Sequence, residues 1–106
     1  MPKYLFQSSY AAEGVRGLLK EGGSSRVSYL RDLLESRGGK LEAFYWAFGE
    51  TDTYLIAEVP SNESAAALAL AVSASGVGRV KTVVLLTPEE IDAAAKQEIS
   101  FRPPGA

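Results

Sequence analysis

The hydrophobic pattern begins with aromatic side chains at Tyr4, Phe6 and Tyr10, and this two-residue spacing is typical of a β-strand. Three further short segments, rich in apolar, aromatic and β-branched residues, are predicted as strands over residues 40–48, 53–59 and 78–86. Leucines at helical spacing follow the first strand, and an alanine-rich segment, residues 61–75, follows the third. The order β-α-β-β-α-β predicts an α+β, ferredoxin-like fold, with a four-stranded antiparallel sheet and two helices on one face.

Glycines are expected to interrupt and to end the first helical segment. The sequence EGGSS at residues 21–25 should break the helix, and Ser24 or Ser25 should cap its restart by accepting from free backbone N–H groups. Gly38 and Gly39 should end it, because glycine adopts the left-handed cap conformation without a Cβ clash.

The C-terminal end of the chain reads as a short helix followed by an extended arm. Thr87 is the expected N-cap, and Glu90 completes a capping box with it. Residues 97–106 are proline-rich and should be extended. They are either a disordered tail or an arm that embraces a partner subunit, with Phe101 as its apolar anchor and Arg102 pairing with a carboxylate.

The second and third strands should form a hairpin across the turn Gly49-Glu50-Thr51-Asp52, with Gly49 supplying an unusual φ angle. Both faces of the second strand are apolar, with Phe44, Trp46 and Phe48 on one side and Leu41, Ala43, Tyr45 and Ala47 on the other. The fourth strand is similar. Two helices cover one face of a sheet only, so we expect a symmetric homodimer that packs sheet against sheet, with Phe48 and Val84 in the interface.

Composition excludes several classes of function. The chain has 106 residues, which fits one domain over 1–106, and a net charge of −2, which argues against binding nucleic acid or anionic membranes. It has no cysteine and no histidine, which removes thiolate nucleophiles, disulfides, iron–sulfur ligands, the usual zinc sites and Ser-His-Asp relays. We therefore expect no metal and no cofactor. The chain shows neither a signal peptide nor a membrane-spanning apolar run, so we expect a cytoplasmic protein.

The aromatic strand and its turn contain the candidate ligand site. Tyr45, Trp46 and Phe48 could wall a pocket with Glu50 or Asp52 at its mouth. Hydrogen-bond donors could come from Tyr4, Tyr45, Trp46, Tyr54 and Asn62. In the alternative interpretation, the aromatic residues fill the core and the dimer interface, and Asp52 caps the turn through the backbone. Two carboxylates in one turn offer too few oxygens for a Mg²⁺ or Ca²⁺ site.

Several segments together resemble the GYD domain family, namely MPKYLFQSSY, EGVRGLLKEGGSSR, GGKLEAFYWAFGETD, ALALAVSASG, VKTVVLLTPEE and FRPPG. The resemblance covers essentially the whole chain and implies a small bacterial protein of the dimeric α/β-barrel group. The family is named for a Gly-Tyr-Asp motif just after the second strand. Gly49 and Asp52 match this motif, whereas Thr51 stands where the tyrosine is expected.

No strong catalytic constellation is visible, so the leading hypothesis is a homo-oligomeric small-molecule-binding or interaction module. The wider fold group includes cofactor-free monooxygenases of aromatic compounds, and the resemblance therefore implies an alternative, a cofactor-independent monooxygenase or isomerase acting on a small aromatic or apolar substrate. A cavity lined by Trp46 and tyrosines with one buried titratable group would favour the enzyme. A filled core would favour the binder or a scaffold, and a structural assembly unit, the third hypothesis, would form higher oligomers and lack a pocket.

Overall fold

The computed structural model describes residues 1–106 and contains four strands and four helices. They follow the order β1 (Lys3–Tyr10), α1 (Ala12–Glu21), α2 (Gly23–Ser36), β2 (Lys40–Trp46), β3 (Thr53–Glu58), α3 (Asn62–Ala74), β4 (Gly78–Leu85) and α4 (Pro88–Ala95). None of these helices combines the length and the apolar character needed to cross a bilayer.

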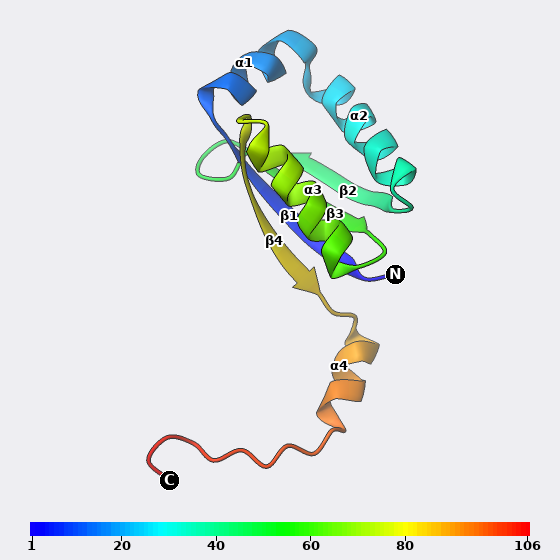
Figure 1. The fold of residues 1–106 in the computed structure, drawn as a ribbon, viewed down its shortest axis with the longest axis vertical. Coiled ribbons are helices and arrows are strands. Elements are labelled where there is room, and N and C mark those ends of the chain that lie inside the picture. The colour runs from blue at the N-terminus through cyan, green and yellow to red at the C-terminus, as the bar shows by residue number, and fades with distance from the viewer.

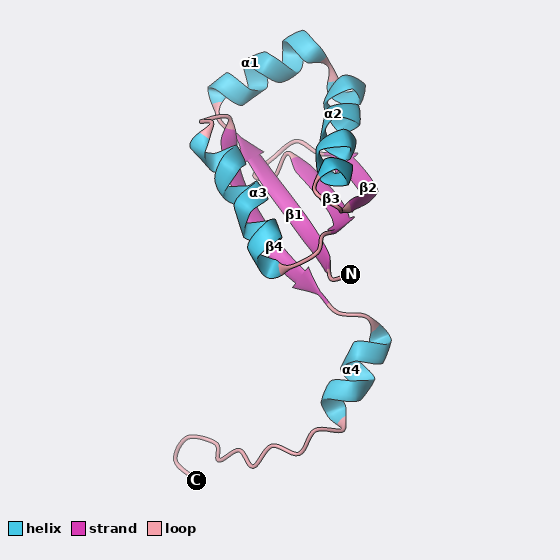
Figure 2. Cartoon of the chain, turned by 45° about the vertical axis from the view of Figure 1, so that its right-hand side comes forward, coloured by secondary structure: helices cyan, strands magenta, loops and turns pink.

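The strands form one antiparallel sheet in the order β2-β3-β1-β4. Helices α2 and α3 lie on one side of it, and α1 lies near the end of β1, as Figure 2 shows. This arrangement confirms the α+β class and the four-stranded antiparallel sheet, and it is consistent with a ferredoxin-like fold.

The two long helices cover the edges of the sheet rather than its centre. Helix α2 packs on the edge strand β2, and α3 packs on the opposite edge strand β4. The central strands β1 and β3 lie between them (Figure 1). Helices α2 and α3 therefore stand on opposite edges of the sheet.

Alternation along β1 and β3 separates the two faces of the sheet. Tyr4, Phe6 and Ser8 of β1 are buried under the helices, as are Thr53 and Ala57 of β3. The apolar core consists of Tyr4, Phe6, Leu34, Ala57, Val59 and Ala65. Only nine of the 106 residues are buried, so a single chain has a small core for its length.

A β-bulge in β2 corrects the predicted faces of that strand. The register passes from Leu41 opposite Ala57 to Ala43 opposite Ile56, which leaves Glu42 as the extra residue. Leu41 therefore lies on the helix-bearing face, although simple alternation placed it with Ala43. The Glu42 carboxylate accepts a 2.6 Å hydrogen bond from Lys3 Nζ, and this bond raises the pKa of Lys3 above its usual value.

Phe48 and Val84, which are expected in the dimer interface, do not lie where simple alternation along their strands predicts. Strand β2 ends at Trp46, so Phe48 lies in the loop, where it is fully exposed rather than aligned with Phe44 and Trp46 on the sheet. Val84 pairs with Tyr4, and directly opposed residues share a face, so Val84 lies on the helix-bearing side of the sheet. Neither residue belongs to the face of the sheet opposite the helices, which we call the bare face.

The helical segment after β1 breaks as expected, but it restarts differently. Gly22 has a φ of 89° and is the N-cap of α2, which begins at Gly23 without any side-chain cap. The predicted cap at Ser24 or Ser25 is wrong, because both residues already lie in the first helical turn. Gly38, with a φ of 79°, follows the end of α2 as predicted.

The C-terminal end extends away from the rest of the molecule (Figure 1). Helix α4 begins with the predicted capping box between Thr87 and Glu90. The radius of gyration is 16.9 Å, against about 13 Å for a compact domain of this size. Ile99 and Phe101 are exposed on this segment, and the Arg102 guanidinium donates to the carbonyl oxygen of Ala106.

Candidate functional site

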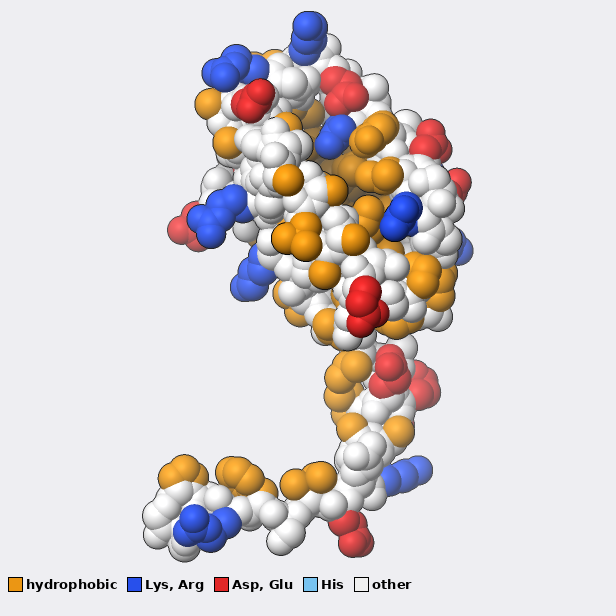
Figure 3. Space-filling view, in the orientation of Figure 1, with side chains coloured by type: hydrophobic (Ala, Val, Ile, Leu, Met, Phe, Trp, Pro, Cys, Tyr) orange, Lys and Arg blue, Asp and Glu red, His pale blue; other side chains and the backbone are white.

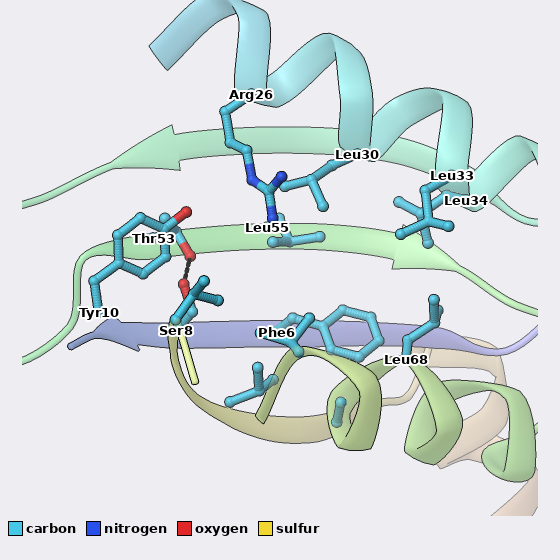
Figure 4. Close-up of a pocket in the computed structure, with 14 residues that line it drawn as sticks. Phe6, Ser8, Tyr10, Arg26, Leu30, Leu33, Leu34, Thr53, Leu55 and Leu68 are labelled. Carbon is cyan, nitrogen blue, oxygen red and sulfur yellow. Dashed lines mark hydrogen bonds between the residues drawn. The ribbon is translucent and has the colours of Figure 1, made fainter. Parts of the chain in front are cut away.

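An apolar cavity of about 80 Å³ lies between α2 and α3 over the centre of the sheet. Its floor includes Phe6 and Leu55 of the two central strands (Figure 4). Leucines of α2 and apolar residues of α3 form its walls, namely Leu30, Leu33, Leu34, Leu68, Ala69 and Val72. Figure 3 shows hydrophobic side chains around a hollow in the upper half of the molecule. The cavity is a direct consequence of the wide spacing of α2 and α3.

Two hydroxyl groups stand in the floor of this cavity. Ser8 of β1 and Thr53 of β3 are directly opposite each other in the register, and their hydroxyl groups are hydrogen bonded (Figure 4). Both residues are buried. The mutual bond uses one of the two hydroxyl protons, so the other is free to donate to a ligand.

Arg26 is the one charged residue that lines the cavity. Its side chain points from α2 toward the sheet (Figure 4), and it is half-buried. The guanidinium forms no ion pair, and its carbon lies 4.9 Å from the centroid of the Tyr29 ring. A cation thus stands at the edge of an apolar cavity without a carboxylate partner.

A second, more polar cleft of about 290 Å³ adjoins the cavity. Glu13, Lys20 and Glu21 of α1 line it. The cleft and the cavity share Tyr10, Arg26 and Val77, so the two spaces are contiguous. We call the apolar space between α2 and α3 the inner cavity and the more polar space the outer cleft. Together they lie just inside the lower end of the size range of small-molecule sites, which is about 300–1,000 Å³.

Tyr4 and Asn62, two of the residues predicted to line a pocket, form a structural pair instead. Tyr4 is buried, and its hydroxyl donates a 2.6 Å hydrogen bond to Asn62 Oδ1 at the start of α3. Neither residue lines the inner cavity or the outer cleft. The bond joins β1 to α3 and satisfies the buried phenol.

The aromatic candidates lie on different sides of the sheet. Tyr45 and Tyr54 are cross-strand neighbours on the bare face, where Tyr45 is 71% exposed. Trp46 lies on the helix-bearing face, packs edge-on against Tyr10 and sits beneath the start of α2, where Gly23 approaches it closely. Phe48 contributes to neither group. The structure therefore does not bring the predicted pocket residues together.

Asp52 organises the loop between β2 and β3. Its Oδ2 accepts a 2.7 Å hydrogen bond from the backbone N–H of Tyr10, and its own N–H donates to the carbonyl oxygen of Ser8 at 2.8 Å. The carbonyl oxygen of Glu50 accepts from Ser9 Oγ at 2.6 Å. These bonds attach the loop to the end of β1. No group of three or more acidic side chains is placed to hold a metal ion.

Pattern reasoning missed Ser8, Thr53 and Arg26. A sequence signal existed for Ser8, because it is a polar residue at an inward position of β1, in line with Tyr4 and Phe6. Arg26 carried no such signal, since its significance depends on the gap between two helices that are distant in sequence.

The chain matches the model of the GYD domain over residues 4–95. It belongs to the GYD domain family. Comparison with curated proteins and with solved structures gave no match. In this GYD protein, Gly49, Thr51 and Asp52 lie in the loop that Asp52 attaches to β1.

Proposed function

We propose that this GYD protein is a homodimeric small-molecule-binding module whose ligand occupies the inner cavity and the outer cleft. The observation that carries the proposal is the apolar space between α2 and α3, which opens at Tyr10 and Arg26 into a polar cleft. Ligand sites of soluble proteins are typically concave, mostly apolar and equipped with a few convergent polar groups.

Binding fits the residues of the inner cavity better than catalysis does. No Asp, Glu or Lys lines it, and Tyr10 and Arg26 are its only titratable residues. A monooxygenase or isomerase would need a group that removes a proton from the substrate. Trp46, which the enzymatic alternative placed in the cavity wall, does not line it. A purely structural unit would have no use for an open apolar cavity.

The bare face of the sheet supports the dimer. Four apolar residues, Ala43, Ile56, Leu5 and Val83, are opposite one another in the register and form one row across all four strands. Tyr45 and Tyr54 form the next row beside it on β2 and β3. No helix of the same chain covers this face (Figure 2). Apolar residues with aromatic neighbours are typical of protein interfaces, and a second copy of the chain would cover the row symmetrically.

The C-terminal arm supports the same assembly. No side-chain hydrogen bond or ion pair joins α4 or the residues after it to the rest of the domain. Ile91 of α4 and both Ile99 and Phe101 of the arm are nevertheless exposed. Docking of these side chains on a partner subunit would bury apolar area that the isolated chain leaves in water.

Native mass spectrometry of protein purified gently from its natural host tests the proposal. We expect a dimer, or a multiple of it, that carries a reproducible additional mass. Ala69→Phe should remove this mass, because Ala69 lines the inner cavity and a phenyl ring would fill it. Ala67→Phe is the matched control, because Ala67 is exposed on the same helix. A bare wild-type protein, or the same mass on Ala69→Phe, would contradict ligand binding in the cavity.

A further inference from the structure

We propose that the ligand is an apolar or aromatic monocarboxylic acid whose carboxylate pairs with Arg26 and whose apolar body fills the inner cavity. The inference rests on the proposed function, because it concerns the ligand of the same site. It adds the ligand's charge, its orientation and the residue that recognises it.

The unpaired state of Arg26 is the main observation. The guanidinium has five N–H donors and no acceptor, and no side-chain or backbone oxygen of this chain accepts from it. It lines both the inner cavity and the outer cleft. A carboxylate placed there would accept two parallel hydrogen bonds in the fork geometry that favours arginine over lysine.

Helix stability does not account for a cation at this position. Arg26 lies near the N-terminus of α2, whose first turn contains no acidic residue. The partial positive charge of a helix N-terminus disfavours a nearby cation. The contact with Tyr29 is one turn along the same helix and accounts for part of the side chain's packing only. The location of Arg26 is thus unfavourable for α2 but suited to an anion at the mouth of the cavity.

The surroundings favour one negative charge on the ligand over two. Glu13 and Glu21 line the outer cleft and Lys20 offsets one of them, so the pair formed with Arg26 leaves a net negative lining that would repel a second charge. The remaining residues near the junction are apolar or carry hydroxyl groups. Leu30, Leu55 and Phe6 would contact the apolar body, and the inner cavity has room for a small group only. A phenyl ring or a short branched chain, attached through a short linker to the carboxylate, meets these requirements.

Phenylacetate and phenylacetamide are the probes for the test, since they share one shape and differ in charge at pH 7. Each is titrated into the ¹⁵N-labelled full chain, and two-dimensional NMR follows the amides of Ser8, Thr53 and Leu55. The variant Arg26→Gln removes the cation. Arg31→Gln is the matched control, because Arg31 is exposed on the same helix and its loss changes the net charge equally.

We expect phenylacetate to bind the wild-type chain about tenfold or more tightly than phenylacetamide, and Arg26→Gln to abolish this preference. Arg31→Gln should retain it. Equal binding of both probes, unaffected by Arg26→Gln, would overturn the carboxylate assignment and leave the cavity as a site for neutral ligands. The absence of cavity shifts with either probe would overturn the assignment and count against the cavity itself. Resonances of Tyr29 and Arg31 report whether Arg26→Gln has disturbed α2.

Discussion

At the scale of single residues, the loop after β2 shows how one aspartate attaches a loop to a neighbouring strand through backbone hydrogen bonds. Asp52 accepts from the N–H of Tyr10 and donates its own N–H to Ser8, both at the end of β1. Ser8 and Tyr10 line the inner cavity. Asp52 therefore attaches its loop to the end of β1, which contributes Ser8 and Tyr10 to the proposed site.

Asp52→Ala should lower the free energy of unfolding by about 1–2 kcal/mol, because the N–H of Tyr10 loses its acceptor. Asp52→Asn keeps a side-chain oxygen and should cost at most about 1 kcal/mol. Glu50→Ala is the control, since no hydrogen bond or ion pair involves the Glu50 side chain, and it should change stability by less than about 0.5 kcal/mol. Urea denaturation measures all three. Full stability of Asp52→Asn with loss of phenylacetate binding would make Asp52 a ligand contact instead.

What could be predicted about the site at this scale was limited to local roles. Short acidic side chains commonly bond backbone groups of their own turn, and this predicts such a cap for Asp52. The carboxylate of Asp52 instead accepts from the N–H of Tyr10, which is distant in sequence. The partnership of Ser8 with Thr53 requires the register of two strands that are separated by two helices and a third strand. Arg26 became notable only when the spacing of α2 and α3 was known. Sites assembled from distant segments depend on packing, which no local pattern encodes.

At the scale of elements, α1 is held by a close backbone contact. Gly14 is buried in α1, and a Cβ at this position would lie 2.2 Å from the carbonyl oxygen of Val77. The same oxygen accepts from the N–H of Ala11 at 2.9 Å. Val77 and Gly14 both line the outer cleft, so this contact determines where α1 stands relative to the site.

Gly14→Ala should lower the free energy of unfolding by about 1–3 kcal/mol, because the methyl group has no space against Val77. Gly17→Ala, in the same helix, meets nothing within 4 Å and should raise stability by up to about 1 kcal/mol through helix propensity alone. Guanidinium denaturation compares the two variants with the parent chain. An equal gain in both would show that α1 is not held against Val77.

The elements themselves were largely predictable, and their irregularities were not. Four strands, the helices and the capping box at Thr87 and Glu90 follow from periodicity and local side-chain chemistry. The bulge at Glu42 does not. Because β2 has apolar residues on both faces, its sequence does not indicate which side chains face the helices, and a shift of one residue leaves no visible sign. Phe48 lies in the loop that follows Trp46, and the bond of Asp52 that attaches this loop to β1 involves a residue outside the hairpin sequence.

At the scale of the whole molecule, the two proposals use opposite faces of one sheet. The proposed ligand lies on the helix-bearing face, and the proposed partner subunit covers the row of Ala43, Ile56, Leu5 and Val83 on the other. A chain that buries nine residues of 106 has much apolar surface left for association. Because the sheet separates the two sites, disruption of the dimer should leave the cavity residues in place, and the proposals can be tested independently.

Two adjacent valines of β4 provide the test of the dimer. Val83 belongs to the row on the bare face, opposite Leu5, whereas Val84 faces the helix side opposite Tyr4 and is 54% exposed. Val83→Asp should therefore produce monomers in analytical ultracentrifugation, since a buried, unpaired carboxylate in the interface is costly. Val84→Asp places the same charge one residue away and should leave the dimer intact.

Circular dichroism shows whether Val83→Asp is folded. If it is unfolded, Tyr45→Glu replaces it as the test, because Tyr45 lies on the same face and its side chain is exposed in the monomer. A folded Val83→Asp or Tyr45→Glu variant that still dimerises like the parent chain would refute association through this face.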